Sequence, residues 1–221
     1  MSKQALVIGL GLFGSGLARA LARHGSEVMA VDIHEGHVDE IAPHVTEAIL
    51  LDATDEEALT SLSPEKRNIC VCAIGADNRE GSIVVTALLK QLGAKHIVAR
   101  ATDPLHARIL RLVGAHEVVQ PEQHFGERLA MRLAWRNIVN VLPLDGDLVL
   151  TEIEAPEALW GRTLAELDLP RRFEVNVAAI RRRAGGEARA TIPDPQTPIA
   201  QGDILMLVST DTAVHTLTEK L

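Results

Sequence analysis

The chain is poor in residues that several classes of protein require. It contains no tyrosine, and aromatic residues make up 2% of its 221 residues. The Tyr/Lys pair with which some dehydrogenases move protons is therefore excluded. With two cysteines there is no disulfide framework, so a reducing cytoplasm fits. Since no apolar run approaches the ~20 residues that a membrane span needs, we expect no transmembrane segment.

Positive charge is also scarce. Lysine and arginine number 22 against 30 aspartates and glutamates, which gives a formal net charge of −8. Proteins that bind the phosphate backbone of nucleic acids in general carry basic clusters, so we expect no nucleic-acid partner. The densest basic run, Arg181 to Arg183, is interpreted as a solvated strand end. The N-terminal apolar run is short and broken by glycine, which is not typical of a secretory signal.

Neither the histidines nor the cysteines form a recognisable reactive group. The nine histidines show no metal-ligand spacing, and we interpret His34 and His37 as surface residues. Cys70 and Cys72 are two positions apart, which places both on one face of a strand and predicts burial as small hydrophobic residues. A redox pair between such neighbours would need strained geometry, although a redox sensor that uses them stays open as an alternative.

A glycine motif near the N-terminus is the most informative feature that is present. The apolar run Ala5 to Ile8 leads directly into G-x-G-x-x-G, formed by Gly9, Gly11 and Gly14. In a Rossmann unit the first glycine permits a tight turn and the second lets the backbone approach a pyrophosphate. The third allows the following helix to pack against the strand, with its N-terminus facing the phosphates. The motif predicts a nucleotide-binding domain.

Segments typical of buried strands and of helices alternate up to about residue 120. This alternation predicts an α/β fold, a Rossmann-type doubly wound parallel sheet, over residues 1–121. The expected strands are Ala5–Gly9, Glu27–Asp32, Ala48–Leu51, Asn68–Ile74, His96–Ala101 and Glu117–Gln120. The expected helices are Phe13–Arg23, His37–Ala42, Asp55–Leu62, Asn78–Leu92 and Pro104–Leu112.

The pattern changes after this region. An amphipathic segment predicts a linking helix over residues 122–140, followed by a small α+β lobe over 141–221 in which prolines and glycines mark turns. In this lobe we expect strands at Val141–Leu144, Leu148–Ile153, Val175–Arg183 and Ile204–Ser209, and helices at Leu164–Asp168 and Asp211–Lys220.

Candidate ligand contacts follow the strands of the predicted sheet. Asp32 ends the second strand, where a carboxylate accepts hydrogen bonds from both ribose hydroxyls of an adenosine and disfavours a 2′-phosphate; a cap on the next helix is the alternative. Asp52, Ala53, Ile74 and Gly75 follow the third and fourth strands at the same sheet edge, where the adenine would lie. The same loops add further candidate contacts at Leu12, Phe13, Ile33, Thr54 and Ala73.

Two charged residues lie further along this edge. Arg100 ends the fifth strand, where its guanidinium can reach a phosphate. Glu122 begins the long helix, where a carboxylate complements the helix dipole without any further role.

The ordered combination of these motifs resembles the RCK family, the regulators of potassium conductance, and within it the cytosolic subunits of Ktr/Trk potassium-uptake systems. In the first half the resemblance rests on Val7 to Gly14, Ala30 to Asp32, Asp52 to Thr54, Ala73 to Ala76, Gly114-Ala115 and Val118 to Glu122. In the second half it rests on Gly161 to Leu167 and Gly202 to Leu205.

The resemblance implies a regulatory subunit rather than an enzyme. Family members form homodimers that assemble into a homo-octameric ring beneath a membrane potassium-translocating subunit, at the cytoplasmic face of the membrane. ATP, ADP, NAD or NADH in the Rossmann cleft changes the ring and gates the pore. The resemblance assigns the phosphates to Gly9, Gly11 and Gly14, with Arg100 nearby. It also implies, in some members, a divalent or sodium ion between subunits at the position of Glu122.

The sequence departs from the family at two places. Leu12 stands where many Ktr-type regulators carry an arginine that meets the γ-phosphate. The protein therefore lacks this means of distinguishing ATP from ADP. Some relatives bind cyclic di-AMP in the second lobe, where Pro170 to Phe173 differ from the usual sequence. The functional alternative is an NAD-dependent oxidoreductase or NAD(H) redox sensor.

Overall fold

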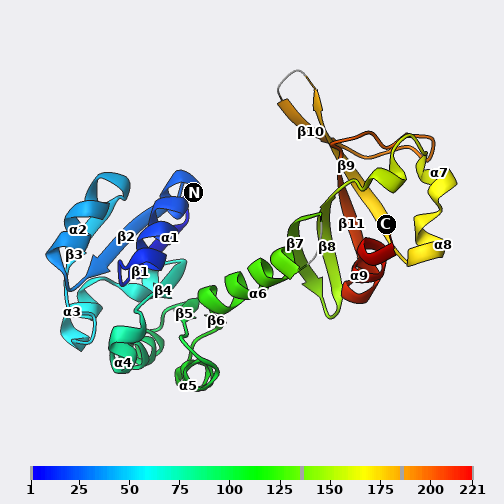
Figure 1. Cartoon of the computed structure of the whole chain (residues 1–221). Helices are drawn as coiled ribbons and strands as arrows, with labels where there is room; N and C mark the ends of the chain where they lie inside the picture. The colour runs from blue at the N-terminus through cyan, green and yellow to red at the C-terminus, as the bar shows by residue number, and fades with distance from the viewer. Residues whose placement is uncertain (1, 135–136, 185–186, 221) are drawn as a thin grey trace. The chain divides into compact units, whose positions relative to one another are not determined.

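The computed structural model describes residues 2–134, 137–184 and 187–220 (Figure 1). The chain divides into two compact units, residues 1–123 and 124–221. None of the described helices is long and apolar enough to cross a membrane.

The first unit is built on a six-stranded parallel sheet. Its strands are β1 (Gln4–Ile8), β2 (Glu27–Asp32), β3 (Glu47–Leu50), β4 (Ile69–Cys72), β5 (Ile97–Arg100) and β6 (Glu117–Val119). They lie in the order β3-β2-β1-β4-β5-β6, and every pairing is parallel. The direction of winding reverses between β1 and β4, where such sheets bind ligands. The Rossmann-type sheet expected from the sequence is confirmed.

Helices connect these strands, and several begin at side-chain caps. They are α1 (Leu12–Arg23), α2 (Glu35–Ile41), α3 (Glu56–Ser61), α4 (Arg79–Gln91) and α5 (Pro104–Val113). Short 3₁₀ turns lie at Ala42–His44, Pro64–Lys66 and Ala76–Asn78. Asp55, Asn78 and Asp103 each accept a hydrogen bond from a backbone amide in the first turn of the following helix.

The core of the first unit lies on both faces of the sheet, as a parallel sheet requires. Cys70 and Cys72 belong to this core and are fully buried, which confirms their interpretation as small hydrophobic residues. Burial raises the pKa of the Cys70 thiol to about 12 and that of Cys72 to about 11. Since the thiolate is the reactive form, neither is suited to redox sensing.

A buried histidine links α4 with α5. His106 is fully buried, and its Nε2 lies 2.8 Å from the Ser82 hydroxyl. Its Nδ1 accepts a hydrogen bond from the Thr102 amide at 3.3 Å, so the ring is neutral and its proton is on Nε2. Burial lowers the pKa of His106, the positive charge of Arg79 lowers it further, and Asp103 opposes the shift.

The second unit is a five-stranded antiparallel sheet with helices. It contains β7 (Ile138–Asp145), β8 (Leu148–Glu154), β9 (Asn176–Ala184), β10 (Glu187–Thr191) and β11 (Ile204–Thr210), in the order β10-β9-β11-β8-β7. The helices are α7 (Leu164–Leu167), α8 (Leu169–Phe173) and α9 (Asp211–Lys220), with a 3₁₀ turn at Glu157–Leu159. The small α+β lobe is confirmed; β10 and α8 were not expected from the sequence.

The helix between the sheets, α6 (Pro121–Ala134), is shorter than the expected range 122–140. Residues 138–140 belong to β7, where Ile138 pairs with Ile153 and Asn140 with Glu152. Residues 135 and 136 of the expected helix lie outside the described part of the chain. Pairing in the sheet therefore overrides the helical pattern at this end of the segment.

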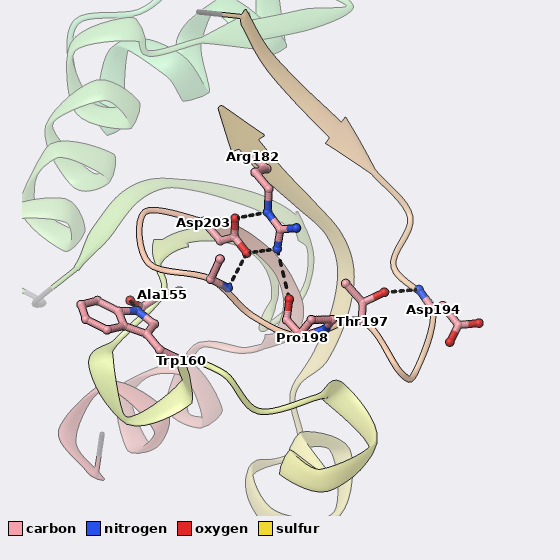
Figure 2. Close-up of polar contacts among 8 residues, drawn as sticks. Ala155, Trp160, Arg182, Asp194, Thr197, Pro198 and Asp203 are labelled. Atoms are coloured by element: carbon pink, nitrogen blue, oxygen red, sulfur yellow. Dashed lines mark hydrogen bonds and ion pairs between the residues drawn. The ribbon is translucent and has the colours of Figure 1, made fainter. Parts of the chain in front are cut away.

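A buried aspartate of the second unit pairs with a half-exposed arginine (Figure 2). Asp203 is 1% exposed, and it accepts hydrogen bonds from Nε and Nη2 of Arg182 at 2.7 and 2.6 Å. It also accepts one from the Ala200 amide at 2.8 Å, and Arg182 donates another to the Pro198 carbonyl. Arg181 pairs with Glu152 at 2.9 Å. Both arginines lie near the end of β9 with side chains 31% and 47% exposed, so the run is partly solvated as interpreted, but each arginine also pairs with an acid.

Candidate functional site

A cleft of about 450 Å³ opens at the carboxyl edge of the parallel sheet, at the ends of β1 to β5. Such an edge, where the winding of the sheet reverses, is the usual place for a ligand in this kind of fold. All but one of the residues expected at the site line the cleft: Gly9, Gly11, Leu12, Phe13, Asp32, Ile33, Asp52, Ala53, Thr54, Ala73, Ile74, Gly75, Arg100 and Glu122.

The three glycines of the motif have different steric roles. Gly9 has a φ of +91°, and a Cβ there would lie 2.9 Å from the Ile74 amide nitrogen. A Cβ at Gly14 would lie 1.8 Å from the Gly9 carbonyl oxygen, so Gly14 holds α1 against the loop and does not line the cleft. A Cβ at Gly11 would meet nothing within 4 Å. The open space beside Gly11, at the start of α1, is where a phosphate can approach the backbone.

Asp32 is held by backbone amides at the end of β2. Its side chain is 8% exposed; Oδ2 accepts a hydrogen bond from the Leu10 amide at 2.6 Å, and Oδ1 accepts one from the His34 amide at 2.8 Å. A carboxylate offers about four acceptor positions, so these bonds orient the group without saturating it. The remaining positions face a cleft, as recognition of a ribose requires.

Two histidines lie beside this carboxylate. His34 and His37 are both exposed, which confirms their interpretation as surface residues, and both also line the cleft. His37 Nδ1 is 3.3 Å from Asp32 Oδ2, and the two imidazoles meet edge to face with ring centroids 5.4 Å apart. One signal in the sequence pointed to these two cleft residues: both closely follow Asp32, the expected ribose-binding acid, at the start of a helix.

Asp52 and its neighbours form the wall after β3. Asp52 accepts hydrogen bonds from the amide and the hydroxyl of Thr54 at 2.9 and 2.6 Å. The bond from the hydroxyl and then that from the amide hold the pKa of Asp52 below its usual range. Ala53 is 4% exposed and Ala73 2%. This wall therefore combines an ionised turn with small apolar groups, which suit a planar base.

Arg100 crosses the cleft near the glycine motif. Its Cζ lies 5.8 Å from the centre of the Phe13 ring, and Nη2 pairs with Glu122. A Cβ at Gly75 would come within 3.3 Å of Nη1, so a glycine leaves room for the guanidinium. Arg100 Nε is buried and has no hydrogen-bond partner within the described part of the chain. Arg100 itself lines the cleft, so its guanidinium can donate to an anionic ligand there.

Glu122 does not form a metal site within one chain. It lies in the first turn of α6, and its carboxylate already pairs with Arg100. Among the described residues there is no group of three or more histidine, cysteine, aspartate or glutamate side chains that could hold a metal ion. The residues present therefore do not fit a resident metal without further ligands.

Leu12 stands at the mouth of the cleft. Its side chain is 99% exposed, at the first position of α1. The cleft also includes residues that were not expected from the sequence: Ile8, His34, His37, Leu51, Ala76, Asp77 and Asn78.

Comparisons with known proteins cover nearly the whole chain. The TrkA-N domain model matches residues 5–121, and the TrkA-C domain model matches residues 148–221. The Ktr system potassium uptake protein C of Bacillus subtilis (strain 168) is 36% identical over 97% of this chain and 95% of its own length. The Ktr system potassium uptake protein A of Vibrio alginolyticus is 35% identical over 93% of this chain and 92% of its own.

Solved structures share the fold. The crystal structure of the GsuK RCK domain has a TM-score of 0.69 at 19% identity, covering 99% of this chain and 47% of that one. The GsuK channel bound to NAD has a TM-score of 0.67 at 18% identity, over 98% of this chain and 39% of that one. This chain thus spans about half of those chains or less, and at such identity the likeness concerns the fold alone.

Proposed function

We propose that this chain, which belongs to the family with TrkA-N and TrkA-C domains, is a nucleotide-binding regulatory subunit of a Ktr-type potassium-uptake system. The observation that carries the proposal is the cleft beside the glycine motif, which Asp32 lines with its carboxylate oriented by two backbone amides. The names of relatives that match over more than nine-tenths of their own length support the assignment to potassium uptake.

The cleft supports an adenine nucleotide as the ligand. The loop of Gly9 and Gly11 and the N-terminus of α1 would hold the phosphates, with Arg100 as a further donor, and Asp32 would accept from the ribose hydroxyls. The apolar wall after β3 and β4 would hold the adenine: Ala53, Ala73, Ile74 and Gly75. Gly14 contributes by packing, while Leu12, Phe13, Ile33, Asp52 and Thr54 border the site. A structural neighbour is named as bound to NAD, which is consistent with this class of ligand.

A regulatory role is proposed in place of catalysis. A nucleotide regulates such a protein only by binding two of its conformations with different affinity. Under this proposal a second copy completes a homodimer and further copies a homo-octameric ring, which contacts the membrane potassium subunit at the cytoplasmic face. Co-purification with that membrane subunit checks this partner. We expect the two proteins to co-purify only when the ring is intact. Oxidation of candidate alcohols or acids with NAD, followed at 340 nm, would contradict the non-enzymatic role.

The first experiment is a thermal shift of nucleotide-stripped protein against ATP, ADP, NAD, NADH and cyclic di-AMP. A ligand at ~100 times its Kd should stabilise the folded protein by about 2.7 kcal/mol. We expect stabilisation by adenine nucleotides, with ATP and ADP little different because Leu12 carries no charge. The Leu12→Arg variant should separate them. If no nucleotide shifts the transition, the binding proposal is wrong.

The ion at Glu122 remains a separate proposal. Because Arg100 already neutralises this carboxylate, a divalent or sodium ion would need ligands from a bound phosphate or a second copy as well. Stabilisation by Mg²⁺ only in the presence of nucleotide, and its loss in Glu122→Gln, would support the ion. Equal stabilisation of Glu122→Gln would contradict it.

A further inference from the structure

We propose that His37 is a proton-sensitive competitor for the ribose-binding carboxylate of Asp32, so that protonation of His37 weakens nucleotide binding. The inference rests on the proposed nucleotide site and adds a regulation of it. Its structural basis is the position of the His37 imidazole in the cleft, with Nδ1 3.3 Å from Asp32 Oδ2.

The acceptor positions of Asp32 are limited. Of about four positions on a carboxylate, the amides of Leu10 and His34 occupy two, and the His37 imidazole lies beside Oδ2 at ion-pair distance, 3.3 Å. A ribose that donates both of its hydroxyls needs the other two positions, and a protonated His37 beside Oδ2 competes for them. The amides belong to the backbone of the two loops and are fixed. His37 is a side chain, 44% exposed, and its contact is the one that must be given up.

The charge of His37 sets the cost of this exchange. Histidine is the side chain whose charge ordinarily changes between pH 5 and 8. A neutral imidazole has no charge that holds it at the carboxylate and gives way readily to a hydroxyl. A protonated imidazole forms an ion pair with the carboxylate, and a neutral hydroxyl must then replace a charge. Nucleotide affinity therefore falls as the pH falls.

The charged groups around His37 are carboxylates and arginines, so the imidazoles are the groups in the cleft whose charge can change with pH. Of the other charged groups that line the cleft, Asp52 has its pKa held low by Thr54, and Arg100 is paired with Glu122. Asp77 also lines the cleft. On α2 the charged neighbours are Glu35, Asp39 and Glu40, and Glu40 pairs with Arg19 of α1 at 2.7 Å. His34 is the second imidazole, and it touches Asp32 through its backbone amide only.

The test measures the affinity of nucleotide-stripped protein for NAD⁺ and for adenosine by calorimetry at about pH 8 and about pH 5.5, the range in which histidine titrates. Neither probe carries a terminal phosphate, which would itself titrate near pH ~6. Wild type should bind roughly two- to fivefold more weakly at the lower pH, the range that measured energies of exposed ion pairs give. His37→Gln should show little pH dependence, and the matched control His34→Gln should retain it.

A second readout uses reciprocity. If protons and nucleotide compete, binding at about pH 6 must release protons, which appears as a heat that depends on the ionisation enthalpy of the buffer. His37→Gln should abolish this dependence. Equal affinities of wild type at both pH values, or pH dependence that persists in His37→Gln, would overturn the inference. Failure of both probes to bind at either pH would overturn the nucleotide site and this inference together.

Discussion

Two buried aspartates, one in each unit, show how similar residues come to different uses. Asp32 and Asp203 are 8% and 1% exposed; Asp32 accepts hydrogen bonds from two backbone amides and Asp203 from one. Both acids line cavities, but Asp203 is paired through both oxygens with the guanidinium of Arg182. Among the described residues Asp32 has no guanidinium partner, and the imidazole beside it, His37, is 44% exposed. Burial of an acid alone therefore does not indicate a binding site; what distinguishes the two is whether the acid is held in a two-bond pair by an arginine of the same unit.

The largest expected effect comes from breaking the pair of Asp203 with Arg182. Asp203→Ala removes both Arg182 bonds and leaves the Ala200 amide without its acceptor. We expect the second unit to lose about 3 kcal/mol of unfolding free energy, as for bonds to charged groups at a buried site. Hydrogen exchange of the β9 and β11 amides measures this loss.

The control for this variant lies in the same loop. Asp194 is exposed and accepts a bond from the Gln196 amide at 2.8 Å, so Asp194→Ala should cost less than about 1 kcal/mol. A similar loss in both variants would show that the pair with Arg182 contributes nothing specific. Nucleotide affinity should be unchanged in either.

The glycine motif gives the next effect. In Gly14→Ala the new Cβ would lie 1.8 Å from the Gly9 carbonyl, so α1 and the loop must separate. We expect a loss of about 2 kcal/mol, as for overpacking, together with weaker nucleotide binding. Gly16→Ala, on the same helix with nothing within 4 Å of the Cβ, should instead gain up to ~1 kcal/mol. Denaturant titration of the two variants tests this, and equal stabilities would exclude the packing role.

The variant Asp32→Ala tests the role of the cleft aspartate in nucleotide binding. It should weaken binding of adenine nucleotides by at least ~1 kcal/mol, about what hydrogen bonds to a charged group are worth. Calorimetric titration with ADP and NAD measures the change, with Asp203→Ala as the matched control that keeps affinity. Unchanged affinity in Asp32→Ala would remove Asp32 from the site and erase the contrast between the two acids.

The smallest effect is a difference in pH response. His106 is neutral in the folded state with a lowered pKa, whereas the unfolded chain takes up its proton near pH ~6.5. The stability that it contributes is present above that pH and is lost as the pH falls through the folded pKa. Denaturation at about pH 7.5 and pH 5.5 should therefore show a loss that His106→Gln reduces. If His106→Gln lost as much stability as wild type between these pH values, the pH dependence of stability would come from other groups.

Asp203 responds in a lower range of pH. Burial opposes its ionisation, but the hydrogen bonds from Arg182 and from the Ala200 amide outweigh burial and leave its pKa below the usual value. Its contribution is present above the unfolded pKa, near pH ~3.9, and is lost as the pH falls through the folded value. A loss of hydrogen-exchange protection of the β9 and β11 amides already at pH ~5.5 would contradict the expectation that Asp203 responds at lower pH than His106.

The alternating pattern was enough to predict the parallel sheet, because each strand there is a short buried run followed by a turn. Asp32 was predictable for the same reason: it ends a strand beside the glycine motif. His37 was not, since the expected helix began at residue 37, whereas α2 begins at Glu35, and His37 in its first turn lines the cleft.

Long-range pairing explains what else could not be read from the sequence. Arg182 and Asp203 are separated by a hairpin, so nothing local to the arginine indicates its acid. β10 consists of polar and small residues, and its position comes from antiparallel pairing with β9. Glu122 alone indicated a helix dipole; its contact with Arg100 exists only because β5 and α6 meet at the same edge.

The distribution of aromatic residues makes the two units optically distinct. Residues 1–123 of the first unit contain no tryptophan, and the chain has no tyrosine. Trp160 is anchored by a hydrogen bond from its indole nitrogen to the Ala155 carbonyl at 2.8 Å (Figure 2). The emission spectrum of the unlabelled protein therefore has no contribution from a tryptophan or tyrosine of the first unit, and Trp160 reports on the second. Any change in that spectrum when a nucleotide enters the cleft of the first unit would be a direct signal of communication between the two.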